Sequence, residues 1–160
     1  MGRAAYNVLV IPYRWRSGRP EFAVLYRSDA KMCQFIAGGG EGGETPFAAA
    51  LREAREEAGI TSAGPWTKLD AMASLPRSAF PEAGWPPEVL VIPEHPFAVD
   101  VGSAALCLSP EHSGQKWMTY ADALQALTWD SNKVALYELN ERLQLRISEA
   151  DLGNRNALEP

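Results

Sequence analysis

The sequence predicts an α/β fold in which helices sandwich a mixed sheet, within a single domain spanning residues 1–160. Stretches rich in β-branched and aromatic residues alternate with a few segments of helical periodicity, which is the order expected for a sheet covered by helices. A chain of 160 residues also has the length of one domain and is long enough to bury a hydrophobic core.

The first 37 residues are expected to supply three strands. Residues 7–13, 21–27 and 33–37 are rich in residues that favour strands. The segment 14–20 contains Ser17 and Gly18, a typical turn pair, so the first two strands are expected to form a hairpin.

A helix is expected over residues 46–58. Thr45 is a good N-cap, Pro46 suits the first helical position and Gly59 suits the C-terminal cap. At 3.6 residues per turn, one narrow apolar stripe is expected to face the core, formed by Phe47, Ala50, Leu51, Ala54 and Ala58.

The rest of the chain is expected to contain further strands, one long loop and two closing helices. Strands are predicted at residues 65–75, 88–101 and 104–109. The Pro-rich stretch 76–87 is the expected loop, and a loop of this kind beside a site often shapes substrate choice. Helices are predicted at residues 120–127 and from 131 to about 147, the second with Ala135, Leu136, Leu139 and Leu143 at core spacing.

Composition and charge exclude several classes of function. Hydrophobic residues make up 46% and charged residues 22%, which is ordinary for a globular protein. The net charge of -5 argues against broad nucleic-acid binding, so no stable nucleic-acid partner is expected. No apolar run has the length of a membrane span and no signal-peptide pattern is present, so we expect a cytoplasmic protein without membrane association.

The helix over 46–58 carries a group of carboxylates that needs an explanation. Glu53, Glu56 and Glu57 share an arc of about 100° with Arg52 at its edge. Like charges this close destabilise a helix, whereas a divalent cation would hold them together. Oxygen ligands of this kind suit Mg²⁺ or Mn²⁺. A Glu-rich helix can also be a solvated surface, but the preceding glycine turn, the separate Glu44 and the final glycine favour a metal-dependent catalytic role.

The segment 38–60 resembles the Nudix box. That pattern is Gly, five residues, Glu, seven residues, and then Arg-Glu-U-x-Glu-Glu-x-Gly-U, where U is aliphatic. Ala54 is a small residue for its aliphatic position, and the fixed positions are filled by Gly38, Glu44, Arg52, Glu53, Glu56, Glu57, Gly59 and Ile60.

The resemblance implies a Nudix-like α/β/α sandwich and hydrolysis of a nucleoside diphosphate linked to another group, with Mg²⁺ or Mn²⁺. It implies that Glu56 and Glu57 are the main metal ligands. It makes Glu53 a further ligand or the general base and Arg52 the residue that orients it, so that Arg52, Glu53 and Glu57 are the expected catalytic residues. It further implies that Glu44 is a supporting carboxylate behind the ligands, and that the backbone carbonyl of Gly38 or Ala37 completes a coordination shell.

The C-terminal half is similar to the branch of the family that hydrolyses dihydroneopterin triphosphate. The similarity rests on Glu111-His112, Lys116-Trp117 and the segment 127–136 around Trp129-Asp130-Ser131-Asn132. It implies that Glu111 is a distal metal ligand or base, that Ser131 contacts the substrate, and that Arg3 and Arg27 face the phosphates. Ala37 stands where this branch has a threonine just before the box glycine.

Several of these distal residues have a simpler interpretation. Glu111 could be an ordinary charged loop residue, and His112 is expected to be a turn residue. Ser131 could instead cap the last helix. Glu94 could be another carboxylate of the site, but an exposed strand residue is the favoured interpretation.

The leading functional hypothesis is a Mg²⁺-dependent pyrophosphohydrolase that cleaves a nucleoside-triphosphate-like substrate into a monophosphate and pyrophosphate. Dihydroneopterin triphosphate or a (d)NTP would fit, so the expected partner is a small nucleotide or pterin triphosphate, and a homodimer is possible. The alternatives are an ADP-ribose or sugar-nucleotide pyrophosphatase and, from another class, a non-catalytic nucleotide-binding sensor. The complete set of box glutamates argues against the sensor.

Overall fold

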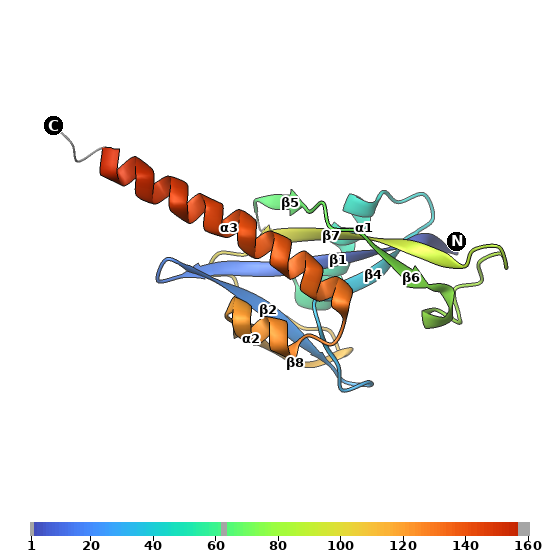
Figure 1. Cartoon of the computed structure of the whole chain (residues 1–160). Helices are drawn as coiled ribbons and strands as arrows, with labels where there is room; N and C mark the ends of the chain where they lie inside the picture. Colours follow the sequence, from blue (N-terminus) through green and yellow to red (C-terminus); the bar gives the residue numbers. More distant parts are fainter. Residues whose placement is uncertain (1, 62–63, 157–160) are drawn as a thin grey trace.

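The computed structural model describes residues 2–61 and 64–156, in which eight strands form one mixed sheet (Figure 1). The strands are β1 (Arg3–Arg16), β2 (Arg19–Arg27), β3 (Cys33–Gln34), β4 (Ile36–Glu41), β5 (Trp66–Lys68), β6 (Ala73–Pro76), β7 (Val91–Asp100) and β8 (His112–Met118). The helices are α1 (Pro46–Ala58), the 3₁₀ helix η1 (Arg77–Ala79), α2 (Tyr120–Ala126) and α3 (Asp130–Asn156).

The long strand β1 organises the sheet. It pairs antiparallel with β2 near its C-terminal end and antiparallel with β4 near its N-terminal end, and it runs parallel to β7. Its side chains alternate between two cores, because successive strand residues point to opposite faces. Val8 and Val10 pack with α1, whereas Leu9 and Ile11 pack with α2 and α3. Helices therefore cover both faces of the sheet, and the predicted α/β sandwich with a mixed sheet is confirmed.

Helix α1 begins and ends as predicted, but its buried face differs from the prediction. Thr45 Oγ1 accepts a hydrogen bond from Ala48 N at 3.2 Å, and Gly59 ends the helix in the left-handed region with φ 66°. The predicted stripe is wrong at Phe47 and Leu51, which are 44% and 41% exposed. Small side chains face the sheet instead, and they let the helix approach it closely: Ala49, Ala50, Ala54 and Ala58.

The strand predictions hold best near the N-terminus. The β1–β2 hairpin is confirmed, with Ser17 and Gly18 both at positive φ as its tight turn requires. The predicted strand at 33–37 is divided into β3 and β4, and the one at 65–75 into β5 and β6.

The predicted strand at 104–109 is wrong, because backbone N–H groups of this segment bond to the end of α1 and not to a neighbouring strand. Cys107 N donates to Ala58 O at 2.9 Å and Ser109 N to Glu57 O at 3.0 Å, so this segment satisfies carbonyls at the end of α1. The strand of this region is β8, which follows it, pairs with β2 and was not predicted.

The end of the chain agrees with the prediction in type but not in length. Helix α2 matches the predicted 120–127, and the four core positions expected in the last helix are buried. Helix α3, however, continues to Asn156, and its C-terminal part extends beyond the sheet (Figure 1). Among the described residues, no helix has both the length and the apolar character needed to cross a membrane.

Candidate active site

A cavity of about 930 Å³ lies on the sheet between the end of α1 and the start of α3. Three carboxylates and two arginines of the predicted site line it: Glu53, Glu57, Glu111, Arg3 and Arg27. Ala37, Gly38 and Ser131 line it as well. Glu44, Arg52 and Glu56 do not, and lie behind or beside the lining residues. The structure thus brings together residues that are far apart in the sequence.

The glycines of β4 allow side chains to lie directly on its backbone. A Cβ atom added to Gly38 would sit 2.0 Å from Cδ of Glu53, and one added to Gly39 would sit 2.4 Å from Cζ of Arg3. A Cβ at Gly40 would sit 2.0 Å from the Tyr6 hydroxyl oxygen. None of the three glycines has positive φ, so their backbone conformation does not require glycine. Glycine is required because a Cβ atom would collide with the side chains that lie against β4.

Arg52 links the glycine turn to the carboxylates of α1. Its Nε and Nη2 donate to the two oxygens of Glu44 at 3.0 Å each, and Nη2 also donates to Gly39 O at 2.7 Å. Its Nη1 donates to Glu53 Oε1 at 2.8 Å and to Glu56 Oε2 at 3.2 Å. Hydrogen bonds from Arg52 also hold the pKa of Glu44 below its usual value. This planar fork fixes the orientation of Glu53.

Burial raises the pKa of Glu53 to about 7, because removal from water disfavours the charged form. Its hydrogen bond and attraction to Arg52 oppose this shift, and repulsion from Glu57 and Glu56 adds to it. Glu56 differs from its neighbours, since its side chain is 53% exposed.

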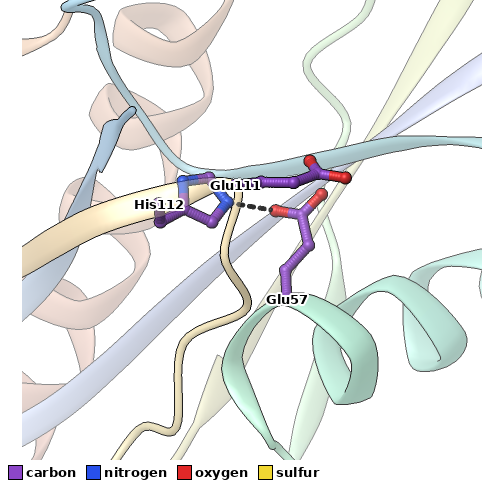
Figure 2. Close-up of side chains that lie close together, drawn as sticks. All are labelled: Glu57, Glu111 and His112. Carbon is purple, nitrogen blue, oxygen red and sulfur yellow. Dashed lines mark hydrogen bonds and ion pairs between the residues drawn. The ribbon is translucent and has the colours of Figure 1, made fainter. Parts of the chain in front are cut away.

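His112 holds the carboxylate of Glu57, the last of the three glutamates grouped on α1 (Figure 2). The His112 Nε2 lies 2.9 Å from Glu57 Oε2, and the carboxylate of Glu111 lies beside them, so that ligand atoms of all three fall within 4.8 Å of one another. Nε2 therefore carries a proton and donates to Glu57. Burial raises the pKa of Glu57, the contact with His112 opposes the shift, and the charge of Glu111 reinforces it.

His112 was not expected to belong to the site, since it was interpreted as a turn residue. It is instead the first residue of β8 and is buried. Its ring reaches Glu57 because the 104–109 segment is bonded to the end of α1, as described above. The adjacent Glu111 was the only signal in the sequence that pointed to this position.

The chemistry of these donors fits a divalent cation. Glu53 and Glu57 are carboxylates whose pKa values are raised by burial, and Glu111 adds a third negative group beside them. Arg52 is engaged by four carboxylate or carbonyl groups, so its single charge does not neutralise the set. Hard oxygen ligands in this arrangement suit Mg²⁺ or Mn²⁺.

Arg3 is positioned on one side of the cavity by the predicted loop 76–87. Its guanidinium lies 4.7 Å from the centre of the Phe80 ring, and its carbonyl accepts a hydrogen bond from Trp85 Nε1 at 2.7 Å. Burial lowers the pKa of Arg3, an effect that the nearby Glu53 opposes. The guanidinium stays charged, because an arginine titrates far above neutral pH.

Arg27 lines the cavity near Glu57 and Glu111 and is held by Asp29. Two hydrogen bonds of 2.9 and 2.8 Å join the guanidinium to both carboxylate oxygens. The bonded guanidinium lowers the pKa of Asp29 to about 2.

The turn before α3 is bonded to β3 and forms a third wall. Thr128 N donates to Cys33 O at 3.0 Å, and Asn132 Oδ1 accepts from Phe35 N at 2.9 Å, where β3 gives way to β4. Trp129 and Ser131 line the cavity next to these contacts. Asn132 itself was named in the sequence only as part of the turn motif, and its buried hydrogen bond explains why an asparagine stands there.

The remaining wall consists of residues 71–76 and is fixed by the middle of α3. Glu138 accepts hydrogen bonds from Asp70 N at 2.8 Å and Ala71 N at 2.6 Å. Arg142 donates to both Glu138 and Asp70. This clamp sets the position of the segment that leads into β6.

Two polar residues on the cavity floor were missed or misjudged from the sequence. Glu94 was expected to be an exposed strand residue, but it is only 4% exposed and lines the cavity. Asn7, also 4% exposed, donates from Nδ2 to Glu94 Oε2 at 2.8 Å. In the sequence, Asn7 is a polar residue at the start of the apolar run of β1, and this was the signal that could have indicated a polar cavity floor.

Comparisons with known proteins agree with this geometry. The NUDIX domain family model matches residues 6–139. A solved structure of a NUDIX hydrolase from Listeria monocytogenes is 42% identical, with a TM-score of 0.81, and the match covers 90% of this chain and 97% of the other. A search of curated proteins gave no match.

Two more distant structures share the fold. The dihydroneopterin triphosphate pyrophosphohydrolase of E. coli is 22% identical, with a TM-score of 0.71 and coverage of 88% of this chain and 99% of the other. The NUDIX domain of Shewanella oneidensis NrtR, solved with ADP ribose, is 13% identical, with a TM-score of 0.67 and coverage of 89% and 90%. With the family model covering most of its length and a relative of this identity, the chain belongs to the Nudix hydrolase family and is a pyrophosphohydrolase.

Proposed function

We propose that the protein is a Mg²⁺-dependent pyrophosphohydrolase that cleaves a nucleoside-triphosphate-like substrate, dihydroneopterin triphosphate or a (d)NTP, into a monophosphate and pyrophosphate. The observation that carries the proposal is that a single cavity is lined by both charged and apolar side chains. Glu53, Glu57 and Glu111 line it together with Arg3 and Arg27, which suits phosphates and a cation. Apolar residues such as Leu75 and Pro96 line it as well, which suits a flat heterocycle.

The residues of the site have distinct roles in the proposed reaction. Glu53, Glu57 and Glu111 would hold the cation, with Glu56 and the Gly38 carbonyl as further ligands. When bound, a divalent cation neutralises charge on phosphate oxygens and lowers the pKa of water. Arg3 and Arg27 bind the phosphate chain, and Ala37 and Ser131 contact the substrate beside them.

We assign the proton transfer to Glu53. Glu53 lines the cavity, and the 2.8 Å hydrogen bond from Arg52 fixes its carboxylate there, so that it is placed to accept a proton from an attacking water. Arg52 orients its carboxylate, and Glu44 in turn orients Arg52. Arg52, Glu53 and Glu57 are the proposed catalytic residues, and Glu44 supports them through Arg52.

A substrate panel tests this proposal. The purified protein is incubated with Mg²⁺ and, separately, with the four NTPs, dihydroneopterin triphosphate, ADP-ribose, a sugar nucleotide and a dinucleoside polyphosphate. Release of pyrophosphate and a monophosphate from a triphosphate is the expected result. Turnover of ADP-ribose or the sugar nucleotide without turnover of any triphosphate would favour the alternative pyrophosphatase. The ADP ribose bound to the Shewanella domain is a reason to include that arm.

Other expectations about the whole protein remain predictions. Organisation as one domain over residues 1–160, location in the cytoplasm and a homodimeric state are each open to direct measurement. Limited proteolysis, cell fractionation and sedimentation would test them in turn.

A further inference from the structure

Glu94 stands apart from the carboxylates that surround the proposed cation. It belongs to β7, where its cross-strand neighbours are Asn7 on β1 and Ala73 on β6. Side chains of paired residues project from the same face, so these three form one row on the cavity floor. Ala73 and Glu94 both line the cavity.

The Glu94 carboxylate is buried but only partly satisfied. Within the described part of the chain, its one hydrogen-bond donor is Asn7 Nδ2, at 2.8 Å from Oε2. A carboxylate offers about four acceptor positions. Its remaining acceptor positions, on Oε1 and on Oε2, are available to a molecule in the cavity.

Asn7 fixes which groups remain free. Its Oδ1 accepts from Arg3 Nη2 at 2.8 Å, so its amide group must direct Nδ2 to Glu94. Among the described residues, Arg3 and Glu94 form no direct ion pair, and each is hydrogen-bonded to Asn7 instead. Arg3 remains positive for a phosphate, and Glu94 remains an acceptor for a different part of the same substrate.

We propose that Glu94 recognises the heterocycle of the substrate and selects a 2-amino-4-oxo pyrimidine edge, as found in guanine and in pterins. This inference rests on the proposed function, because it names the base class of the triphosphate. A carboxylate only accepts hydrogen bonds. The 2-amino-4-oxo edge is the one that offers a ring N–H and an amino group side by side, and both can donate to one carboxylate.

Other bases place an acceptor against the carboxylate. Adenine and cytosine each have an unprotonated ring nitrogen beside the amino group, and the N–H of uracil lies between two carbonyl oxygens. In these pairings, an acceptor of the base faces an acceptor of the carboxylate. A polar site discriminates strongly against ligands that leave its hydrogen-bonding groups unpaired, whereas an apolar site discriminates only weakly between ligands of slightly different size. The apolar walls at Leu75 and Pro96 favour a flat ring but do not distinguish one base from another.

The first test compares substrates on the unmodified protein. The kcat/KM for GTP and for dihydroneopterin triphosphate is expected to exceed that for ATP and UTP by about 100-fold. Inosine triphosphate, which lacks only the 2-amino group, is expected to fall about tenfold below GTP. Equal kcat/KM values for GTP, inosine triphosphate and ATP would overturn the inference. The comparison of GTP with dihydroneopterin triphosphate shows whether guanine or the pterin is preferred.

The second test changes the residue. Glu94→Gln preserves size but places an amide N–H₂ against the amino group of the base, so the preference for GTP over ATP should fall to within about threefold. Glu88→Gln is the matched control, because Glu88 is exposed in the neighbouring loop and does not line the cavity. An unchanged preference in a folded Glu94→Gln protein would exclude the role of Glu94.

A binding measurement separates this inference from the proposed reaction. Titration calorimetry without a divalent cation compares GMP, IMP and AMP. Tighter binding of GMP than of AMP, lost in Glu94→Gln, supports base recognition even if no triphosphate is hydrolysed. Hydrolysis without base preference supports the reaction and overturns the role of Glu94.

Discussion

Replacing Gly38 with alanine tests whether Glu53 acts from the position seen in the structure. The new Cβ would lie 2.0 Å from Cδ and 2.1 Å from Oε1 of Glu53, whereas ordinary contact begins near 3.4 Å. The carboxylate must therefore move by about 1.4 Å, the difference between 3.4 and 2.0. That shift breaks its 2.8 Å hydrogen bond to Arg52.

A displacement of about 1 Å in a catalytic group can reduce the rate about 100-fold, which corresponds to about 2.7 kcal/mol of transition-state stabilisation. We expect a loss of this size in kcat for pyrophosphate release by the Gly38→Ala protein. The fold should survive, because the clash involves a side-chain end and not backbone, and the melting temperature should shift by less than about 4 °C.

Gly43→Ala is the matched control, since a Cβ at Gly43 meets nothing within 4 Å and its φ is not positive. Its kcat should stay within about twofold of the unmodified protein, because no contact is disturbed. A Gly38→Ala protein with normal kcat and a normal melting temperature would refute the reasoning, because Glu53 would then work from a place other than the one against Gly38.

The other predictions concern Glu57, its partner His112, and Glu138, which fixes one wall of the cavity. Glu57→Gln is expected to abolish Mg²⁺-dependent pyrophosphate release while the circular dichroism spectrum is unchanged, and normal turnover would remove Glu57 from the mechanism. His112→Asn should raise the Mg²⁺ concentration for half-maximal rate by about 10–100-fold, because the group that orients Glu57 is lost; an identical Mg²⁺ titration would show that the contact has no such effect. Glu138→Gln should reduce the free energy of unfolding by about 1 kcal/mol at neutral pH, measured by urea denaturation. Burial opposes the lowered pKa of Glu138, but the N–H groups of Asp70 and Ala71 and the contact with Arg142 outweigh it. Because the pKa of Glu138 is lower in the folded protein than in the unfolded chain, where it is about 4.3, the ionised carboxylate stabilises the fold above that pH. This stabilisation is lost as the pH falls through the folded-state pKa, so the difference in unfolding free energy between the two proteins should shrink below about pH 4. A difference that is independent of pH would contradict this account.

The parts of the fold that follow from local chemistry could be predicted. The bounds of α1 depend on Thr45 and Gly59, and the hairpin turn depends on Ser17 and Gly18, all of which act on adjacent backbone. The residues at 104–109 have the composition of a strand, yet their amides bond to the end of α1, which no local pattern encodes. Strand β8 begins His112-Ser113-Gly114, a sequence more typical of a turn, and pairing with β2 overrides that preference.

The same distinction applies to the site. The spacing in α1 was sufficient to group Glu53, Glu56 and Glu57, because a helix has a fixed geometry. It could not show that Glu57 is buried, because the side chain that contacts it is His112, which is 55 residues away in the sequence. Glu94 was misjudged for a related reason, because β7 gains neighbours on both sides, and only the assembled sheet covers it.

The length of α3 has a consequence for how the molecule opens. Arg146 Nη1 still donates to the Tyr13 hydroxyl at 3.5 Å and Ile147 is half-buried, whereas residues 148–155 are exposed, so one continuous helix has a packed part and a shorter part in water. A helical stretch this short is marginal in water without packing. Amide hydrogens in the packed part should therefore exchange with solvent only when the whole protein unfolds, while those after Ile147 exchange through local fraying. Hydrogen exchange should thus divide α3 into two segments of very different protection at a position where its backbone shows no break.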